Sequence, residues 1–282
     1  MSETAHRVHT ASFRAIPGSA RALVPSVEDS LAARLLPFVL SLIAGSVDVI
    51  GFLGLDGLFT AHITGNLVVL AAHIVAGSDA SVSLVISVPV FVVALAATRL
   101  LAERLELSGV APLSPLLLLQ FVLICGFLAI AGGTDPRANA NTPGMIIAAM
   151  LGVSGMAVQN ALVRIALTGA PSTAVLTTNI TLLTMDLGDI LLGQRDSAKA
   201  RDRSRRTSPA VAGFLLGCAL GAWCEAAIGL RALALPASFA LLALALGVFA
   251  TLHRPFGGTT PAHPTNNVNT SQSNDSFPRP RQ

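Results

Sequence analysis

The chain has 282 residues, of which 52% are hydrophobic and only 12% are charged, and its formal net charge is +3. Soluble domains carry roughly 25% charged residues, so this composition excludes an ordinary soluble globular protein, and the small net charge gives no basis for a nucleic-acid partner. Apolar stretches of about 20 residues are long enough to cross a bilayer, and the chain contains several: 35–55, 82–102, 112–132, 143–165, 209–230 and 233–252. We therefore expect an all-α polytopic membrane protein with the lipid bilayer as a partner.

The two ends of the chain differ from these apolar stretches. Residues 1–34 are polar and lack the apolar core of about 7–15 residues that a cleavable signal needs. Residues 255–282 are rich in Pro, Asn, Ser and Thr, a composition that cannot bury enough apolar surface to fold. We expect both segments to be disordered tails on the cytoplasmic side.

The first apolar stretch contains an aspartate, Asp48, in the sequence LSLIAGSVDVIGFLGLDG, and no cationic residue stands within one helical turn of it. Removing a carboxylate from water favours its protonated form. That property suits a proton-carrying carboxylate or a cation ligand. The alternative is a buried, neutral, hydrogen-bonded aspartate with a structural role.

The next segment, residues 59–77, is apolar but contains polar residues. In a helix, His62, Asn66 and His73 would lie within roughly 40° of one another, so they would form one stripe along an apolar rod. Such groups are costly against lipid and should face the protein interior or a wet cavity. We take His62, Thr64 and Asn66 as candidate binding residues. Asn66 could instead cap a broken helix or bond across a helix interface, and His73, a secondary candidate, could be interfacial.

An internal repeat links this segment to the second half of the chain. FTAHITGNLVVL (59–70) aligns without a gap with STAVLTTNITLL (172–183), which pairs Thr64 with Thr177 and Asn66 with Asn179. Each copy follows one long apolar stretch and precedes two more. We therefore expect a first membrane repeat over 35–133, a connecting loop over 134–142 and a second membrane repeat over 143–254.

The two motif segments, 59–77 and 172–193, either cross the membrane or only enter it. If they are re-entrant or broken helices, six transmembrane helices remain and the halves are inverted; if they cross, there are eight spans in parallel repeats. The loop after the first motif, GSDAS, has no basic residue, whereas its counterpart contains the six basic residues between Arg195 and Arg206. Equivalent loops on opposite membrane faces would differ in this way, so we favour six spans. The basic loop could also bind anionic lipid.

The second half supplies further candidate residues. Gln159 and Asn160 occupy nearly the place of Asp48, while Asn179 and Asp186 occupy the places of Asn66 and His73. We take Gln159, Asn160, Thr177 and Asn179 as binding candidates and Asp186 as a secondary one, which could instead meet Arg195 and its neighbours. The glycines Gly213, Gly217 and Gly221 have the small-xxx-small spacing of a close helix–helix contact.

No catalytic motif, nucleotide loop or metal-ligand spacing is present, and the three cysteines, all in apolar stretches, form no disulfide framework. We expect no catalytic residue, metal or cofactor.

The stretch from Ala44 to Gly77 resembles the signature region of the YoaK family, bacterial membrane proteins defined by a domain of unknown function. The resemblance covers most of 35–252 and is carried by Ala44, Gly45, Asp48, Phe59, His62, Thr64, Gly65 and Asn66. The second motif departs from the pattern, because Thr178 stands where the stronger form has glycine. The resemblance implies a bacterial inner-membrane protein and supplies no substrate.

Three functions remain open from the sequence. The duplication and the matched polar residues favour a transporter or channel for a small solute or a proton, with a midplane site where the repeats meet. The alternatives are an intramembrane enzyme and a non-transporting scaffold or regulator. Oligomer formation is compatible with each of them.

Overall fold

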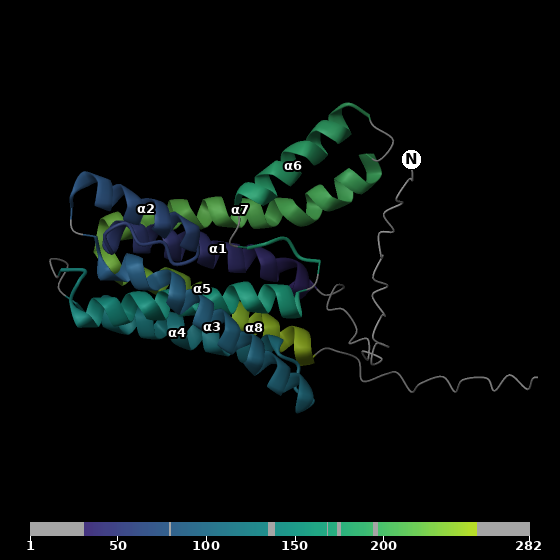
Figure 1. Ribbon diagram of the computed structural model, residues 1–282. Coiled ribbons are helices and arrows are strands. Elements are labelled where there is room, and N and C mark those ends of the chain that lie inside the picture. Colours follow the sequence, from purple (N-terminus) through teal and green to yellow (C-terminus); the bar gives the residue numbers. More distant parts are fainter. Residues whose placement is uncertain are drawn as a thin grey trace, which may run out of the picture.

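The computed structural model describes residues 31–78, 80–134, 139–167, 169–173, 176–193 and 197–252. This part of the chain is helical, with a short 3₁₀ helix between its last two α-helices (Figure 1). Residues 1–30 and 255–282 of the expected tails, Arg195 and part of the 134–142 loop lie outside the described residues, whereas residues 31–34 of the expected N-terminal tail begin the first helix. The elements in chain order are α1 (Leu31–Gly54), α2 (Ile63–Ala76), α3 (Val82–Leu107), α4 (Leu113–Ala131), α5 (Pro143–Ala166), α6 (Leu176–Leu191), α7 (Ser197–Ile228), η1 (Gly229–Leu233) and α8 (Ala234–Leu252).

Length and composition divide the helices into two groups. Five apolar stretches are long enough to cross a membrane, and the last, Ser197–Leu252, covers 56 residues and contains both α7 and α8. In contrast, α2 has 14 residues and α6 has 16, fewer than the about 17–25 that a crossing requires. The protein is therefore an all-α polytopic membrane protein. The first helix of each half of the chain, α1 and α5, is mostly buried, while α3 is mostly exposed.

Glycines set the closest contact in the bundle, between α1 and α7. Gly213 lies against Phe38, Gly217 against Leu42 and Gly221 against Ser46, so the two helices run parallel. A Cβ atom on Gly217 would lie 2.4 Å from the backbone oxygen of Leu42. The backbones can approach this closely only because these positions carry no side chain.

Other contacts establish the directions in which the remaining long helices run. The amide of Val82, at the start of α3, donates to Asn141, just before α5, so α3 and α5 begin at the same end. Gln120 of α4 meets Gln159 of α5, and Phe127 of α4 packs on Gly152, which makes these helices antiparallel. Ser114, near the start of α4, meets Thr251, near the end of α8, so these two helices are also antiparallel.

It follows that α1, α4 and α7 run in one direction and α3, α5 and α8 in the other (Figure 1). Because α1 ends where α3 begins, the segment that contains α2 starts and finishes at one end of the bundle and adds no crossing. The segment that contains α6 does the same at the opposite end. This arrangement matches the expected six spans with two non-crossing helices.

One boundary expected from the sequence is wrong. Residues 197–206, taken as part of a basic loop, are the first turns of α7. Ala, Lys and Arg are good helix formers, and Ala200 is fully buried. Arg203 also pairs with Asp186 of α6. The α6 helix packs along this part of α7, and the two project from the bundle as a hairpin (Figure 1).

Candidate functional site

Asp48 lies about two turns before the end of α1 and is 3% exposed. The loop after α1 turns back toward it, because Asp56 (φ 51°) and Gly57 (φ 80°) adopt left-handed backbone conformations, which Asn, Asp and Gly tolerate best. Leu55 and Leu58 of this loop are buried and anchor it to the bundle. The turn therefore lays residues 59–62 alongside Asp48.

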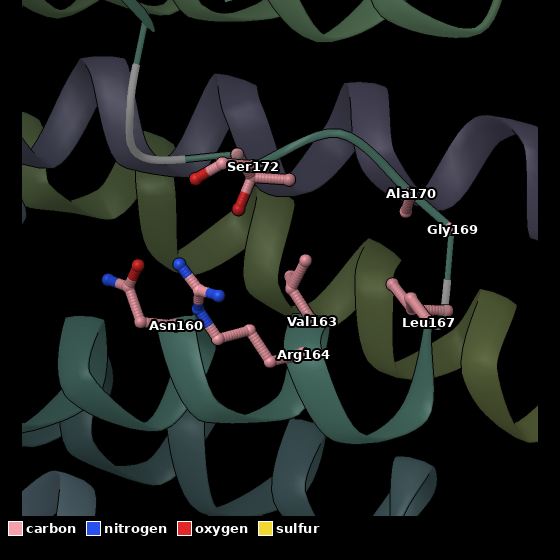
Figure 2. A pocket seen from close by; sticks show the side chains of 8 residues that line it. Asn160, Val163, Arg164, Leu167, Gly169, Ala170 and Ser172 are labelled. Atoms are coloured by element: carbon pink, nitrogen blue, oxygen red, sulfur yellow. The ribbon is translucent and has the colours of Figure 1, made fainter. Parts of the chain in front are cut away.

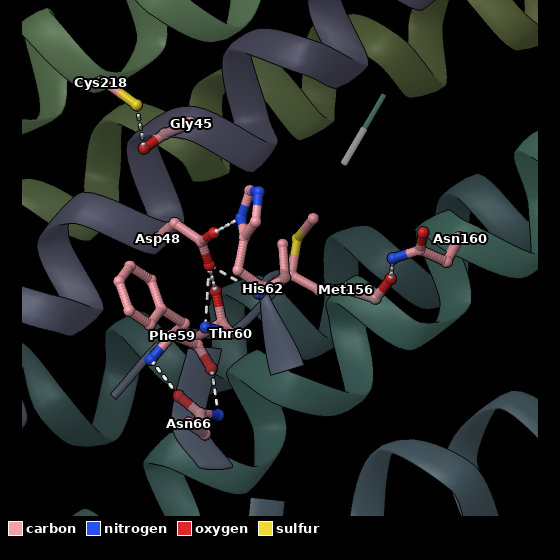
Figure 3. A network of polar contacts seen from close by, with 10 residues as sticks. Gly45, Asp48, Phe59, Thr60, His62, Asn66, Met156, Asn160 and Cys218 are labelled. Atoms are coloured by element: carbon pink, nitrogen blue, oxygen red, sulfur yellow. Dashed lines mark hydrogen bonds and ion pairs between the residues drawn. The ribbon is translucent and has the colours of Figure 1, made fainter. Parts of the chain in front are cut away.

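Both carboxylate oxygens of Asp48 have partners in this loop (Figure 3). Oδ1 accepts hydrogen bonds from the amide of Thr60 at 2.8 Å, from the hydroxyl of Thr60 at 2.9 Å and from the amide of Ala61 at 2.6 Å. Oδ2 lies 2.5 Å from Nδ1 of His62. A carboxylate buried without such partners would be strongly destabilising, so the loop and the acid require each other.

His62 is the member of the pair that reaches the surface of the protein. Its side chain is 35% exposed, against 4% for that of Asp48. The imidazole lies edge-on to Phe214 of α7, with ring centroids 5.4 Å apart, and to Phe59 at 6.2 Å. Within the described residues, Nε2 of His62 has no hydrogen-bond partner, so the ring can exchange a proton there while Nδ1 stays on Asp48.

The asparagine of the first motif has a different task. Asn66 is fully buried, and its Oδ1 accepts from the amide of Phe59 while its Nδ2 donates to the carbonyl of Phe59 and to the hydroxyl of Ser87. It therefore closes the loop that holds His62 and docks α2 on α3. Thr64 is exposed, and the His73 ring hydrogen-bonds Ser78 near the end of α2.

The second half holds a neutral counterpart of the aspartate. Gln159 is fully buried, and its Nε2 donates to the carbonyl of Leu40 at 2.9 Å and to the hydroxyl of Thr173 at 3.0 Å. Its Oε1 accepts from Gln120 at 2.6 Å. Gln159 thus joins α5 to α1, to α4 and to the loop before α6.

The other candidates of the second half do not join this group. Asn160 donates to the carbonyl of Met156 in its own helix, and Asn179 donates to the carbonyl of Ser172. Thr177 is exposed. Asp186 is buried and paired with Arg203, which agrees with the expectation that it meets the basic segment. The structure therefore unites Asp48 with His62, and in the described chain no hydrogen bond joins Asn66 to Asn179.

Two buried threonines and a glutamine were missed as site residues. Thr60 and Thr173 occupy matched positions of the repeat, and each bonds the polar residue of the preceding long helix, Asp48 or Gln159. The repeat alignment contained this signal. Gln120, in the apolar stretch 112–132, could have been noticed as its single strongly polar residue. Among the described residues no group of three His, Cys, Asp or Glu side chains could hold a metal ion.

Comparison with known proteins places the chain in one family. A family model described as "Protein of unknown function (DUF1275)" matches residues 36–246. The match is consistent with the resemblance drawn from the first motif. Comparisons with curated proteins and with solved structures gave no match.

Proposed function

The chain belongs to the DUF1275 family, and we propose that it is a membrane carrier that couples the movement of a small solute to that of a proton. The Asp48–His62 pair would carry the proton. The observation on which this proposal depends most is the difference between Asp48 and Gln159. Both are buried, and both hold the threonine of the adjacent motif.

A neutral amide is sufficient to hold such a loop, since Gln159 holds Thr173 without any charge. The first motif thus carries an ionisable pair at the place where the second carries a neutral amide. Ionisable residues inside a membrane are costly and mark ion or proton paths. Because Oδ1 of Asp48 is occupied by the loop and Oδ2 by His62, the exchangeable proton would reside on the exposed imidazole.

The helix arrangement supports an inverted repeat. The first helix of each half packs against the third helix of the other half, α1 on α7 and α5 on α3. The short helices also correspond, since each packs on the third helix of its own half, α2 on α3 and α6 on α7. Two inverted halves of this kind can alternate around a site at their interface, which is where Asp48 and Gln159 lie.

We also propose an orientation in the bacterial inner membrane. At the end where α3 and α5 finish and α7 begins, the described chain contains Arg99, Arg104, Arg164 and the basic residues from Lys199 to Arg206, whereas Arg231 is the basic residue described at the other end. The positive-inside rule then makes the first end cytoplasmic, with both termini on that side.

Thiol labelling in intact cells tests this orientation. In a variant whose three native cysteines are replaced by alanine, a cysteine at Ser78 should react with an impermeant reagent added outside. A cysteine at Ser204 should react only after the cells are opened. Labelling of both positions from the same side would disprove the inverted arrangement.

Transport itself is tested with purified full-length protein in liposomes that contain a pH-sensitive dye. A panel of small metabolites is added outside, and solute-dependent acidification of the lumen is measured with an imposed pH gradient. We expect Asp48→Asn and His62→Asn to abolish this signal, while the matched control Asp56→Asn, an exposed aspartate in the same loop, leaves it unchanged. A solute whose uptake is the same for wild type and Asp48→Asn would contradict the proposal.

A further inference from the structure

A second polar feature lies outside the Asp48–His62 pair. A cavity of about 330 Å³ opens between the C-terminal half of α5 and the chain segment 169–173 (Figure 2). This volume falls at the lower end of the range of about 300–1,000 Å³ that is usual for small-ligand pockets. Its polar lining comes from Asn160, Arg164, Ser172 and Thr173, and its apolar lining includes Val163 and Leu167.

An exposed cation, Arg164, lines the cavity. Arg164 is in the last turn of α5, and no carboxylate among the described residues pairs with it or lines the cavity. Asn160 lies one turn earlier, on the same face of the helix. Figure 2 shows the guanidinium of Arg164 between the side chain of Asn160 and the segment that contains Ser172.

The neutral groups around Arg164 add hydrogen-bond donors. The Thr173 oxygen accepts a hydrogen bond from Gln159, so the hydroxyl proton of Thr173 is left to donate. The Ser172 hydroxyl provides a second O–H group. Asn160 uses one amide hydrogen on Met156 and keeps the other. A guanidinium that lines a cavity together with such donors can bind the oxygens of an oxyanion.

We propose that this cavity binds a small oxyanion, a carboxylate or a phosphate, that carries a short apolar group against Val163 and Leu167. This inference rests on the proposed function for the statement that the anion is the transported solute. A monoanion that moves together with one proton carries no net charge, which reduces the cost of crossing the bilayer. Gln159 and Thr173, which join the cavity to α1, would connect the anion site to the helix that carries Asp48.

Equilibrium binding without any gradient tests the anion site. The probe is radiolabelled butanoate, bound to full-length protein in nanodiscs of zwitterionic lipid, with unlabelled butanoate and its neutral isostere butanamide as competitors. We expect butanoate to compete and butanamide not to. Arg164→Gln should weaken butanoate binding at least about tenfold, because it removes charge-assisted hydrogen bonds. The matched control is Arg104→Gln, which removes an exposed arginine from the last turn of α3 and not from the cavity lining.

Two outcomes would overturn the site. Equal competition by butanamide would show that charge is not recognised, and equal binding by the two arginine variants would show that Arg164 is not the anion's partner. Circular dichroism and size-exclusion chromatography of each variant confirm that it is folded. Should butanoate fail to bind while native mass spectrometry finds an anionic phospholipid that wild type retains and Arg164→Gln loses, the anion is a lipid headgroup and the soluble-solute assignment is wrong.

The anion site and the proposed carrier function can be tested separately. Asp48→Asn should lose proton-coupled uptake yet keep butanoate binding, because Asp48 does not line the cavity. If wild type shows proton-coupled uptake of a cationic or neutral solute and no anion binding, this inference fails while the carrier proposal stands. If butanoate binds and no solute moves protons, the carrier proposal fails while the anion site stands.

Discussion

The first motif, residues 59–66, and the second, residues 172–179, use the same local device for different ends. In each, the asparagine donates to the carbonyl of the residue seven positions earlier, Phe59 or Ser172. In each, the threonine after that residue bonds a buried polar side chain of the preceding long helix. Among the described residues, only the first motif adds an ionisable pair, and only its asparagine bonds a neighbouring helix, at Ser87. The asparagine hydrogen bonds that hold the loop are therefore common to both motifs and do not depend on the ionisable pair of the first.

The largest expected effect comes from removing the two helix side chains that hold the motifs. Asp48→Ala leaves the amides of Thr60 and Ala61 without an acceptor and His62 without a partner, so it should lower the free energy of unfolding by about 3–5 kcal/mol. Gln159→Ala removes only neutral bonds and should cost about 2–3 kcal/mol. SDS-driven unfolding in mixed micelles, followed by circular dichroism, measures both. Equal losses would mean that the charge of Asp48 adds nothing to the framework.

Next in size is the effect of the asparagines. Asn66→Ala removes three hydrogen bonds inside the protein and should cost about 2–3 kcal/mol, whereas Asn179→Ala removes one bond to Ser172 and should cost about 1 kcal/mol. The same unfolding assay applies. A larger loss of unfolding free energy in Asn179→Ala than in Asn66→Ala would mean that Asn179 stabilises α6 through more than its bond to Ser172.

The threonines give a closely matched pair of substitutions. Thr60→Val removes a hydroxyl that donates to a carboxylate and should cost about 1.5–3 kcal/mol, since bonds to charged groups are the stronger ones. Thr173→Val removes a hydroxyl that accepts from an amide and should cost about 0.5–1.5 kcal/mol. Valine keeps the shape of threonine, so each loss reports the hydrogen bond and not the packing. Melting temperatures in one detergent, converted with the unfolding enthalpy of each variant, provide the check.

Ser87→Ala should have the smallest effect. It removes the bond that extends from Asn66 to α3 and reduces this asparagine to the bonds with its own loop, which resembles the state of Asn179. We expect a loss of about 0.5–1.5 kcal/mol. In Ser87→Ala, the further cost of Asn66→Ala should fall, by less than this loss because Ser87 also donates to the carbonyl of Leu84. Strict additivity of the two changes in a double-mutant cycle would deny that they interact.

The amino-acid sequence by itself determined the membrane class and the six long helices, because hydropathy over about 20 residues is a local property that no later packing changes. It also singled out Asp48, His62 and Gln159, since a polar group in an apolar stretch is conspicuous. It failed at residues 197–206, where charge suggested a loop although Asp186 and the buried Ala200 make these residues a helix.

Only the tertiary structure decided which polar groups meet. The partners of Asp48 follow it by 12 to 14 residues, and Gln159 finds Leu40 at a separation of 119. Those pairings depend on a turn with left-handed backbone at Asp56 and on glycines that let α1 approach α7. Helical periodicity predicted His62, Asn66 and His73 on one stripe of a helix. His62 instead precedes α2, where the turn brings its ring to Asp48, and Asn66 bonds the loop at Phe59. Long-range packing, which no local pattern encodes, divided the polar residues into the Asp48–His62 pair, loop closure and helix contact.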